Sequence, residues 1–339
     1  MPVTLKDIAR RLNISVTTVS RALHGYEDVA EETRQKVLAL AEELGYRPHI
    51  LAQRLQKGRT DTIGFIIPTF GPRFSDPFFS ELLAGIGNEA ARHDYDLLVS
   101  TCPPDTVEEV NAYEQFVMGR RVDGLLITRT RVYDQRIAYL LEKEFPFVAF
   151  GRSKVEGDFC YVDVDSEEGI RLVTRHLIEM GHRRIAMILP PSELMFSVYR
   201  RIGFQKALEK NGLEFDEELV EEGDLTERGG YEAALRLLDK PHPPTAIVAC
   251  NDLMAVGAIG AAQEHRLKVG RDIAITGFDD VPLAEHTVPP LTTVRQPVYE
   301  IGRRICQMLI YILEGKPLPQ RQVILKPKLV IRESSNFHL

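Results

Sequence analysis

A stretch near the N-terminus, residues 4–21 with the sequence TLKDIARRLNISVTTVSR, constrains the fold more than any other part of the chain. Apolar residues recur at helical spacing on both sides of Asn13, which interrupts the pattern. Thr4 followed three residues later by Asp7 is typical of a helix start, and Ser15 is a favourable N-cap for the next helix. The stretch therefore predicts two short helices joined by a tight turn, a helix-turn-helix.

The second of these helices has an outward face that suits DNA. On this face lie Val16, Thr17, Ser20 and Arg21. Small side chains allow close approach to the major groove, hydroxyls bind phosphate, and an arginine can donate two hydrogen bonds to guanine. The shape of the two helices alone is also compatible with a helical hairpin on the protein surface that has no role in DNA binding.

Charge separates this region from the rest of the chain. Residues 1–60 contain ten Lys or Arg and seven Asp or Glu, whereas the whole chain has a net charge of −7. The remaining residues therefore carry −10. A small basic module joined to an acidic body is the pattern expected of a DNA-reading head on a regulatory domain.

Length and composition indicate an ordinary globular protein. The chain has 339 residues, of which 44% are hydrophobic and 27% charged, enough for two or three domains with their own cores. Its four cysteines show no metal-binding spacing and are expected to be buried thiols in a reducing compartment. No signal peptide and no membrane-spanning run is evident, so we expect a cytoplasmic protein without a membrane partner.

A third helix is expected at residues 31–44, closed by Gly45, and completes a DNA-binding domain at residues 1–46. Pro48 disfavours helix at the residue before it. Residues 50–56, with the sequence ILAQRLQ, can form two helical turns but are too short to be stable alone. Residues 47–61 are therefore predicted to be a linker.

From residue 62 onward, short β-branched or aliphatic runs alternate with helical stretches. The expected strands are 63–67, 97–100, 124–127, 147–150, 161–164, 185–189, 246–249, 273–276, 322–325 and 328–332. The expected helices are 78–93, 107–118, 135–143, 166–180, 196–210, 228–238, 252–265 and 299–313. This alternation predicts two α/β lobes with parallel sheets: an N-lobe of about 62–160 plus 292–320, and a C-lobe of about 161–291 plus 321–339. Ligands of such folds bind at the carboxyl ends of the strands.

The head VTLKDIARRLNISVTTVSRAL, the linker YRPHILAQRLQ and the two-lobed body together resemble the lactose-repressor family of bacterial transcription regulators. The resemblance covers essentially the whole chain. It implies an all-α helix-turn-helix head followed by a periplasmic-binding-protein-like α/β core. It also implies a homodimer that represses transcription from a palindromic operator on double-stranded DNA, and a small-molecule effector that binds between the lobes and switches DNA affinity.

Carried over position by position, the resemblance assigns DNA contacts to ten residues. Base edges would be contacted by Val16, Thr17 and Arg21, and phosphates by Thr4, Ser15, Thr18, Ser20 and Tyr46. In the linker, Leu55 matches a leucine that wedges into the minor groove, with Ala52 on the same helix face. Two positions depart from the family pattern: Ala30 replaces a capping serine at the third helix, and His49 replaces an asparagine after Arg-Pro.

In the body, the resemblance assigns effector contacts to five residues. They are Phe78 in DPFFSELLAGI, Arg129 after the third strand, Arg200 in SVYRRIGFQKAL, Asn251 in ACNDLMAVG and Asp279 in ITGFDD. An arginine, an asparagine and an aspartate beside an aromatic wall suit a polyhydroxylated ligand, most simply a saccharide. For each residue, a helix cap or a surface ion pair is the structural alternative.

Other functions remain as alternatives. A transport-type sugar-binding protein would share the two lobes but needs a signal peptide in place of the head, and a purine-responsive regulator would share every motif. No nucleotide-binding, serine-hydrolase or zinc-protease motif is present, and the nine histidines show no metal-helix spacing. We therefore expect a regulator that is not an enzyme and needs no cofactor or metal.

Overall fold

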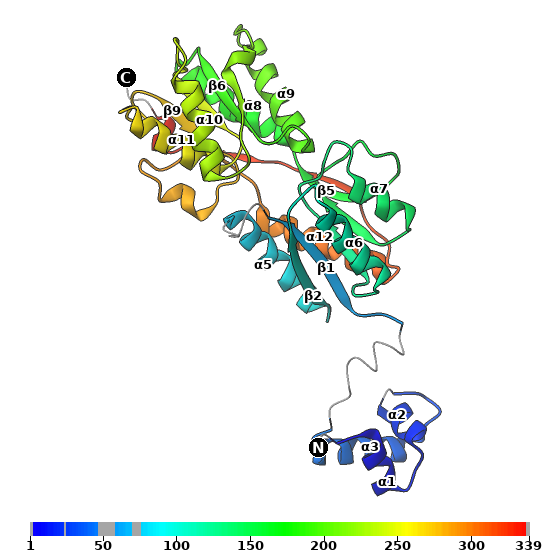
Figure 1. Cartoon of the computed structure of the whole chain (residues 1–339). Helices are drawn as coiled ribbons and strands as arrows, with labels where there is room; N and C mark the ends of the chain where they lie inside the picture. The colour runs from blue at the N-terminus through cyan, green and yellow to red at the C-terminus, as the bar shows by residue number, and fades with distance from the viewer. Residues whose placement is uncertain (1–2, 24, 47–57, 70–75, 337–339) are drawn as a thin grey trace. The chain divides into compact units, whose positions relative to one another are not determined.

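The computed structural model describes residues 3–23, 25–46, 58–69 and 76–336. The chain divides into two compact units, one ending at Thr60 and the other beginning at Asp61 (Figure 1). The linker residues Ala52 and Leu55, with His49, lie outside the described residues, so their predicted roles stay predictions.

The first unit is a three-helix head made of α1 (Leu5–Leu12), α2 (Val16–Leu23) and α3 (Glu31–Glu43). Its core contains Ile8, Val19 and Val37, each with no exposed surface. Asn13 adopts the left-handed conformation, with φ of 53°, and ends α1. The short interval before Val16 then lets the second helix pack against the first, as the helix-turn-helix pattern predicts.

One lobe of the second unit is built on a six-stranded parallel sheet. In spatial order its strands are β11 (Gln322–Leu325), β5 (Cys160–Val164), β4 (Phe147–Phe150), β3 (Gly124–Ile127), β1 (Thr62–Pro68) and β2 (Asp96–Cys102). Side chains alternate across the sheet, so that Phe65 of β1 joins one core and its neighbour Ile66 the other. The first core lies under α5 (Pro77–Arg92) and α12 (Val298–Leu313), and the second under α6 (Val107–Met118) and α7 (Gln135–Glu142).

The other lobe contains a four-stranded parallel sheet in the order β7 (Val220–Glu222), β6 (Ile185–Leu189), β8 (Ala246–Ala249) and β9 (Ala274–Thr276). Its helices pack as two pairs: α8 (Ser166–Glu179) with α9 (Met195–Lys210), and α10 (Glu227–Leu238) with α11 (Asp252–Glu264) (Figure 1). A small antiparallel pair, β10 (Thr293–Arg295) and β12 (Lys328–Val330), packs on α8. The predicted fold class, a helical head followed by a two-lobed α/β core with parallel sheets, is confirmed.

The chain crosses between the lobes three times, after β5, after β10 and after β11. These crossings correct the lobe boundaries expected from the sequence. Residues 161–164 and 322–325 belong to the N-lobe, because β5 pairs with β4 and β11 pairs with β5. Residues 293–295 belong to the C-lobe, because Val294 is buried in its core. A crossing changes the partner of a strand without changing its local pattern, so periodicity does not reveal it.

Two short strands, β7 and β10, were not expected. Each has only three residues, and β7 contains two glutamates, so neither carries the apolar alternation that marks a strand. Their pairing with neighbouring strands, not their composition, makes them extended.

The closest helix packing in the C-lobe depends on glycine. A Cβ added at Gly257 of α11 would lie 2.0 Å from the carbonyl oxygen of Glu227, at the start of α10. A Cβ at Gly260, one turn along the same helix, would lie 3.6 Å from the Tyr231 ring, an ordinary contact. Gly257, unlike Gly260, therefore lets the two helix backbones approach, and Gly230 of α10 does the same from the other side, where a Cβ would lie 2.3 Å from the backbone of Met254.

We predict that Gly257→Ala lowers the free energy of unfolding by about 1–3 kcal/mol, because α10 and α11 must move apart. The matched variant Gly260→Ala should leave stability unchanged or raise it by about 0.5–1 kcal/mol, because alanine favours helix over glycine. Urea unfolding followed by circular dichroism measures both. Equal effects of the two substitutions would contradict the packing argument.

Candidate functional site

The start of α2 is held by Ser15, whose Oγ accepts a hydrogen bond from the backbone N–H of Thr18 at 3.0 Å. The hydroxyls of Ser15 and Thr18 are also within hydrogen-bond distance, at 2.8 Å. At the start of α1, Asp7 accepts hydrogen bonds from the backbone N–H and the hydroxyl of Thr4, at 2.9 and 2.7 Å. These bonds hold the pKa of Asp7 below its usual value. Both predicted helix starts are thus present, and three of the predicted phosphate-contacting hydroxyls lie at them.

The outward face of α2 is open to solvent. Val16 is 40% exposed, and Thr17 and Arg21 are exposed as well. The guanidinium of Arg21 lies 2.5 Å from the carboxylate of Asp28 and 5.1 Å from the centre of the Tyr26 ring. This ion pair restricts the arginine without burying it, so Arg21 is available to a partner of the head.

The remaining head residues have mixed environments. Tyr46 packs against the head core, and partial burial raises the pKa of its hydroxyl. Ser20 is partly buried on α2. Ala30, which precedes α3, makes no side-chain cap, as its departure from the family pattern implied.

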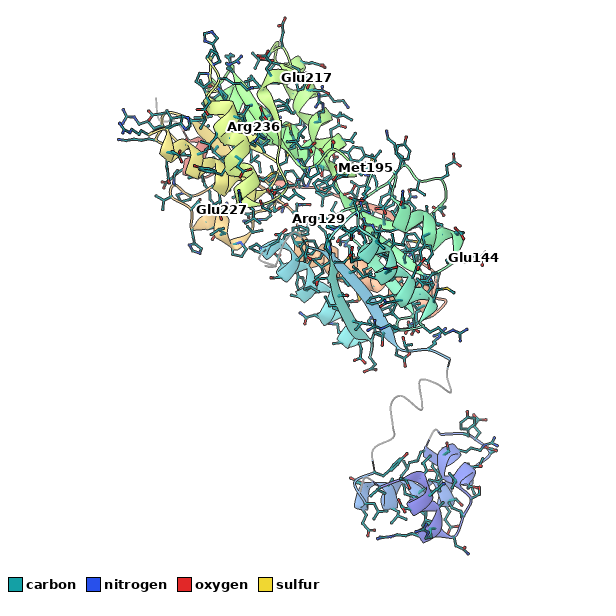
Figure 2. The ribbon with its side chains drawn as sticks, viewed as in Figure 1. Arg129, Glu144, Met195, Glu217, Glu227 and Arg236 are labelled. Atoms are coloured by element: carbon teal, nitrogen blue, oxygen red, sulfur yellow. The ribbon has the colours of Figure 1, made fainter. Side chains whose placement is uncertain are left out.

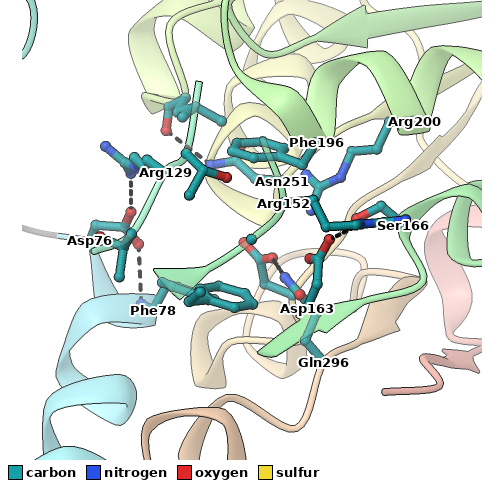
Figure 3. A pocket seen from close by; sticks show the side chains of 16 residues that line it. Asp76, Phe78, Arg129, Arg152, Asp163, Ser166, Phe196, Arg200, Asn251 and Gln296 are labelled. Carbon is teal, nitrogen blue, oxygen red and sulfur yellow. Dashed lines mark hydrogen bonds and ion pairs between the residues drawn. The ribbon is translucent and has the colours of Figure 1, made fainter. Parts of the chain in front are cut away.

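The five residues predicted to contact an effector line one cavity between the two lobes, with an empty volume of about 630 Å³ that includes space open to solvent (Figure 3). Figure 2 places Arg129 of one lobe and Met195 of the other near this boundary, whereas Glu217 and Arg236 lie far from it. The full lining consists of Asp76, Phe78, Thr128, Arg129, Thr130, Phe150, Gly151, Arg152, Asp163, Ser166, Phe196, Arg200, Leu225, Asn251, Asp279 and Gln296.

Strand ends position most of these side chains. Residues 128–130 follow β3, Phe150 ends β4 and residues 151–152 follow it, and Asn251 comes soon after β8. Because the strands of each sheet are parallel, their carboxyl ends meet at one edge, and in both lobes that edge faces the cavity.

Arg200 is the most enclosed of the cavity's arginines, at 4% exposure. Its guanidinium carbon lies 4.6 Å from the centre of the Phe196 ring and 3.9 Å from that of Phe278. The guanidinium donates to the carbonyl oxygen of Cys250, while Nε is buried with no hydrogen-bond partner among the described residues. An unpaired buried donor costs about 1–3 kcal/mol, so this atom favours a ligand that accepts a hydrogen bond.

The other two arginines are already neutralised. Arg129 donates to Asp76 at 2.8 Å, and Arg152 donates to Asp163 at 2.6 Å. Burial raises the pKa of Asp76 and of Asp163, and the arginine beside each acts in the opposite direction. Arg152 also lies 3.6 Å from the centre of the Tyr199 ring on α9, which joins the two lobes across the cavity rim.

Asn251 and Asp279 also make hydrogen bonds within the protein that stabilise the local structure. Asn251 caps α11 by accepting from the backbone N–H of Met254 at 2.9 Å, and its amide donates to the Leu225 carbonyl. Asp279 has a φ of 127°, a strained value outside glycine, and accepts from Gln296 at 2.5 Å. Burial raises the pKa of Asp279 well above its usual value. The helix-cap alternative therefore holds for Asn251, although the residue also lines the cavity.

Aromatic rings form one wall. Phe78, at the start of α5, stacks on Phe150 with ring centres 6.0 Å apart and an angle of 18° between the planes. Asp76 fixes this helix start by accepting from the backbone N–H of Phe78 at 3.1 Å.

Several residues that line the cavity were not predicted from the sequence, among them Asp76, Arg152, Asp163 and Gln296. Of these four residues, only Asp163 could have been recognised from the sequence, because it places a carboxylate inside the apolar strand CYVDV. The others sit in short connections where charged and amide residues are common, and only the meeting of the two lobes gives them a shared surface.

Within the described ranges, no three His, Cys, Asp or Glu side chains gather as a metal site. Nor does any described helix combine the length and hydropathy needed to cross a membrane.

Two family models match the chain. Residues 4–49 match "Bacterial regulatory proteins, lacI family", and residues 174–335 match "Periplasmic binding protein-like domain". The helical head and much of the two-lobed body are therefore each similar to a known family.

Relatives match over almost the whole chain. The HTH-type transcriptional regulator AglR of Rhizobium meliloti is 38% identical, over 99% of this chain and 95% of its own. The HTH-type transcriptional repressor CytR of Escherichia coli is 34% identical, over 98% of this chain and 96% of its own.

Solved structures of the same family are similar to this chain over almost its whole length. The Lac repressor dimer bound to operator and the anti-inducer ONPF has a TM-score of 0.85 at 28% identity, covering 99% of this chain and 100% of its own. A complex of the regulator CelR with cellobiose has a TM-score of 0.77 at 32% identity, covering 98% and 99%. The resemblance seen in the sequence is confirmed: the chain belongs to the lacI family of bacterial regulatory proteins and is a DNA-binding transcriptional regulator.

Proposed function

We propose that this regulator is a homodimeric repressor whose affinity for a palindromic operator is switched by an uncharged saccharide in the cavity between the lobes. The observation that carries the proposal is the charge balance of the cavity lining. Three arginines and three aspartates face it, and two of the arginines are ion-paired within it. A phosphorylated or carboxylated ligand would find little unpaired positive charge there.

A polyol matches the hydrogen-bonding groups that remain. The buried Nε of Arg200 lacks an acceptor, and a sugar hydroxyl supplies one. Asp279, Asn251 and Gln296 add donors and acceptors from three further segments. Because a hydroxyl both donates and accepts, several hydroxyls on one ring can satisfy such a mixed set.

The aromatic wall supports the same ligand class. The stacked rings of Phe78 and Phe150 offer a flat apolar surface for the C–H face of a sugar ring. A planar purine would also stack there, so nucleobases belong in any ligand screen. Among the relatives, CelR was solved with cellobiose and an Enterococcus faecium member with ribose.

DNA recognition is assigned to the head. We propose that Val16, Thr17 and Arg21 contact base edges, while Thr4, Ser15, Thr18, Ser20 and Tyr46 contact phosphates. Leu55 and Ala52 of the linker remain proposed minor-groove contacts on the sequence resemblance alone. Two heads in a dimer would read the two halves of a palindrome, as in other helix-turn-helix dimers.

Switching requires the effector to favour one arrangement of the lobes. Contacts that tie the lobes on the cavity rim include the Arg152–Tyr199 stack and the hydrogen bond from Met195 N–H to the Thr130 carbonyl, at 2.8 Å. A ligand that changes these contacts changes the spacing of the heads. Coupling of this kind is typically about 1–3 kcal/mol, enough to alter operator binding about 5–150-fold.

Arg200→Ala is expected to abolish the response to the sugar while leaving operator binding in its absence within about twofold. Removing the free donor and the cation that stacks on Phe278 should weaken sugar binding by about 100-fold, or 2–3 kcal/mol. A thermal-shift screen of sugars and nucleobases identifies the ligand; calorimetry and operator anisotropy then measure both affinities.

The adjacent Arg201, which pairs with Glu217 outside the cavity, provides the matched control: Arg201→Ala should respond like the parent protein. Arg200→Lys keeps a positive charge in the cavity and serves as the second variant if Arg200→Ala does not fold. A normal response of Arg200→Ala would show that the effector binds elsewhere, and a nucleobase hit without any sugar hit would replace the saccharide.

Arg21→Ala should weaken operator binding by about 10–100-fold, because one bidentate contact to guanine contributes about 1–3 kcal/mol of discrimination. Binding to random DNA should fall far less. Lys36→Ala, on the exposed face of α3 and paired with Glu32, is the control and should change operator affinity by less than about twofold. An equal loss of operator and random-DNA binding would reassign Arg21 to a phosphate.

A further inference from the structure

A second hollow lies beside the cavity and shares no lining residue with it. This outer groove runs between α6 and α7, and its main lining residues are Val107, Val110, Tyr113, Glu114, Tyr133 and Tyr139. Ser192 and Glu193 of the other lobe close one end. Its empty volume, including open space, is about 1810 Å³, so it can hold an extended ligand.

The floor of the outer groove is a saturated ionic network. Arg131 binds Asp105 at 3.0 Å and Glu109 at 2.8 Å. Arg136 binds Asp134 at 2.7 Å and Glu109 at 3.3 Å. Both guanidinium groups are therefore committed to carboxylates, and the three carboxylates exceed the two arginines by one negative charge.

Further carboxylates make the groove negative. Glu114 of α6 and Glu193 of the opposite lobe are exposed at its rim, and neither has an ion-pair partner within 4.0 Å among the described residues. Lys143, whose ammonium lies 5.8 Å from the centre of the Tyr139 ring, is close enough for Glu114 to help raise its pKa. The residues that line the groove thus include four carboxylates, those of Asp105, Glu109, Glu114 and Glu193, against the two guanidinium groups. Its electrostatic potential therefore attracts cations.

Its walls are apolar and aromatic in spite of their exposure. The side chains of Tyr133 and Val107 are each 72% exposed, and Val110 is 53% exposed. Tyr113 lines the groove at 2% exposure, and its phenol oxygen has no hydrogen-bond partner among the described residues. A buried hydroxyl without a partner, set in a negative groove, calls for a donor from a ligand.

We propose that the outer groove is a second ligand site, which binds an extended organic cation of the polyamine class. Ammonium groups have three donors and no acceptor, which suits Glu114, Glu193 and the phenol oxygen of Tyr113. The methylene segments between them pack on Val107 and Val110. The ring of Tyr133 adds a cation–π surface.

A ligand in this groove touches both lobes. The backbone N–H of Val132 donates to the Glu193 carbonyl at 2.8 Å, and Arg131 pairs with Leu194 in an isolated β-bridge. Glu193 therefore sits at the groove only in the lobe arrangement of this structure. A bound polyamine stabilises that arrangement, which makes the site a second input to the regulator, acting on the same arrangement of the lobes as the saccharide.

The test is calorimetric titration of the full-length protein with spermidine at physiological salt. We expect saturable binding of one spermidine per chain. The double variant Glu114→Gln, Glu193→Gln should bind about tenfold more weakly, since two exposed charge contacts are lost. Because the protein as a whole is acidic, the matched double variant Glu156→Gln, Glu209→Gln, which removes two exposed carboxylates from outside the groove, should bind like the parent.

Single variants separate charge from shape. Tyr113→Phe should weaken spermidine binding by about threefold or more without lowering the melting temperature, because its phenol has no partner to lose. Tyr133→Ala should weaken binding, whereas Tyr133→Phe, which keeps the ring, should not.

Three results would overturn the assignment. Equal weakening by the two double variants would mean general attraction to an acidic surface. Groove-dependent binding of a pentalysine peptide without binding of spermidine would make the occupant a basic protein segment. Absence of saturable spermidine binding would remove the site altogether.

Discussion

The parallel direction of the strands is the constraint on which the rest of the body depends. In each of the two parallel sheets every strand ends at the same edge, and three crossings of the chain hold the two edges against each other. Parallel strands need a connection that returns the chain to the other end of the sheet, so each strand end is followed by a turn, in most cases leading into a helix. Those turns contribute Arg129, Arg152 and Asn251 to one surface, although about 120 residues separate the first from the last.

Burial of this surface between the lobes then determines which of its charged side chains must be paired. A charge taken from water must be paired, and Arg129 and Arg152 meet this demand with Asp76 and Asp163. Arg200 instead lies between two phenylalanine rings and donates to a backbone carbonyl, which leaves part of its donor capacity unused. The outer groove resolves its charges differently, with paired arginines below and unpaired carboxylates at the rim. For this reason we propose ligands of different charge for the two neighbouring hollows.

The head and the body were predictable to different degrees. Helices of the head follow from local patterns: Asn13 ends α1, Ser15 caps α2, and apolar residues recur every three or four positions. In the body, the expected helices and most strands lie within a few residues of those in the structure. Periodicity and capping act over a few residues, so they can be recognised without knowing what each element packs against.

The sequence by itself determined the order of the helices and longer strands and the family, and through the family resemblance five of the side chains that line the cavity. It did not determine where the chain crosses between the lobes, because Val164 and Leu325 end strands that look like any others until their pairing is known. Nor did it indicate that Arg129 is neutralised by Asp76, or that Glu193 closes a groove formed by α6 and α7. Those facts belong to tertiary structure, because an ion pair or a cavity wall depends on groups that are distant in sequence and meet only when the two lobes pack together.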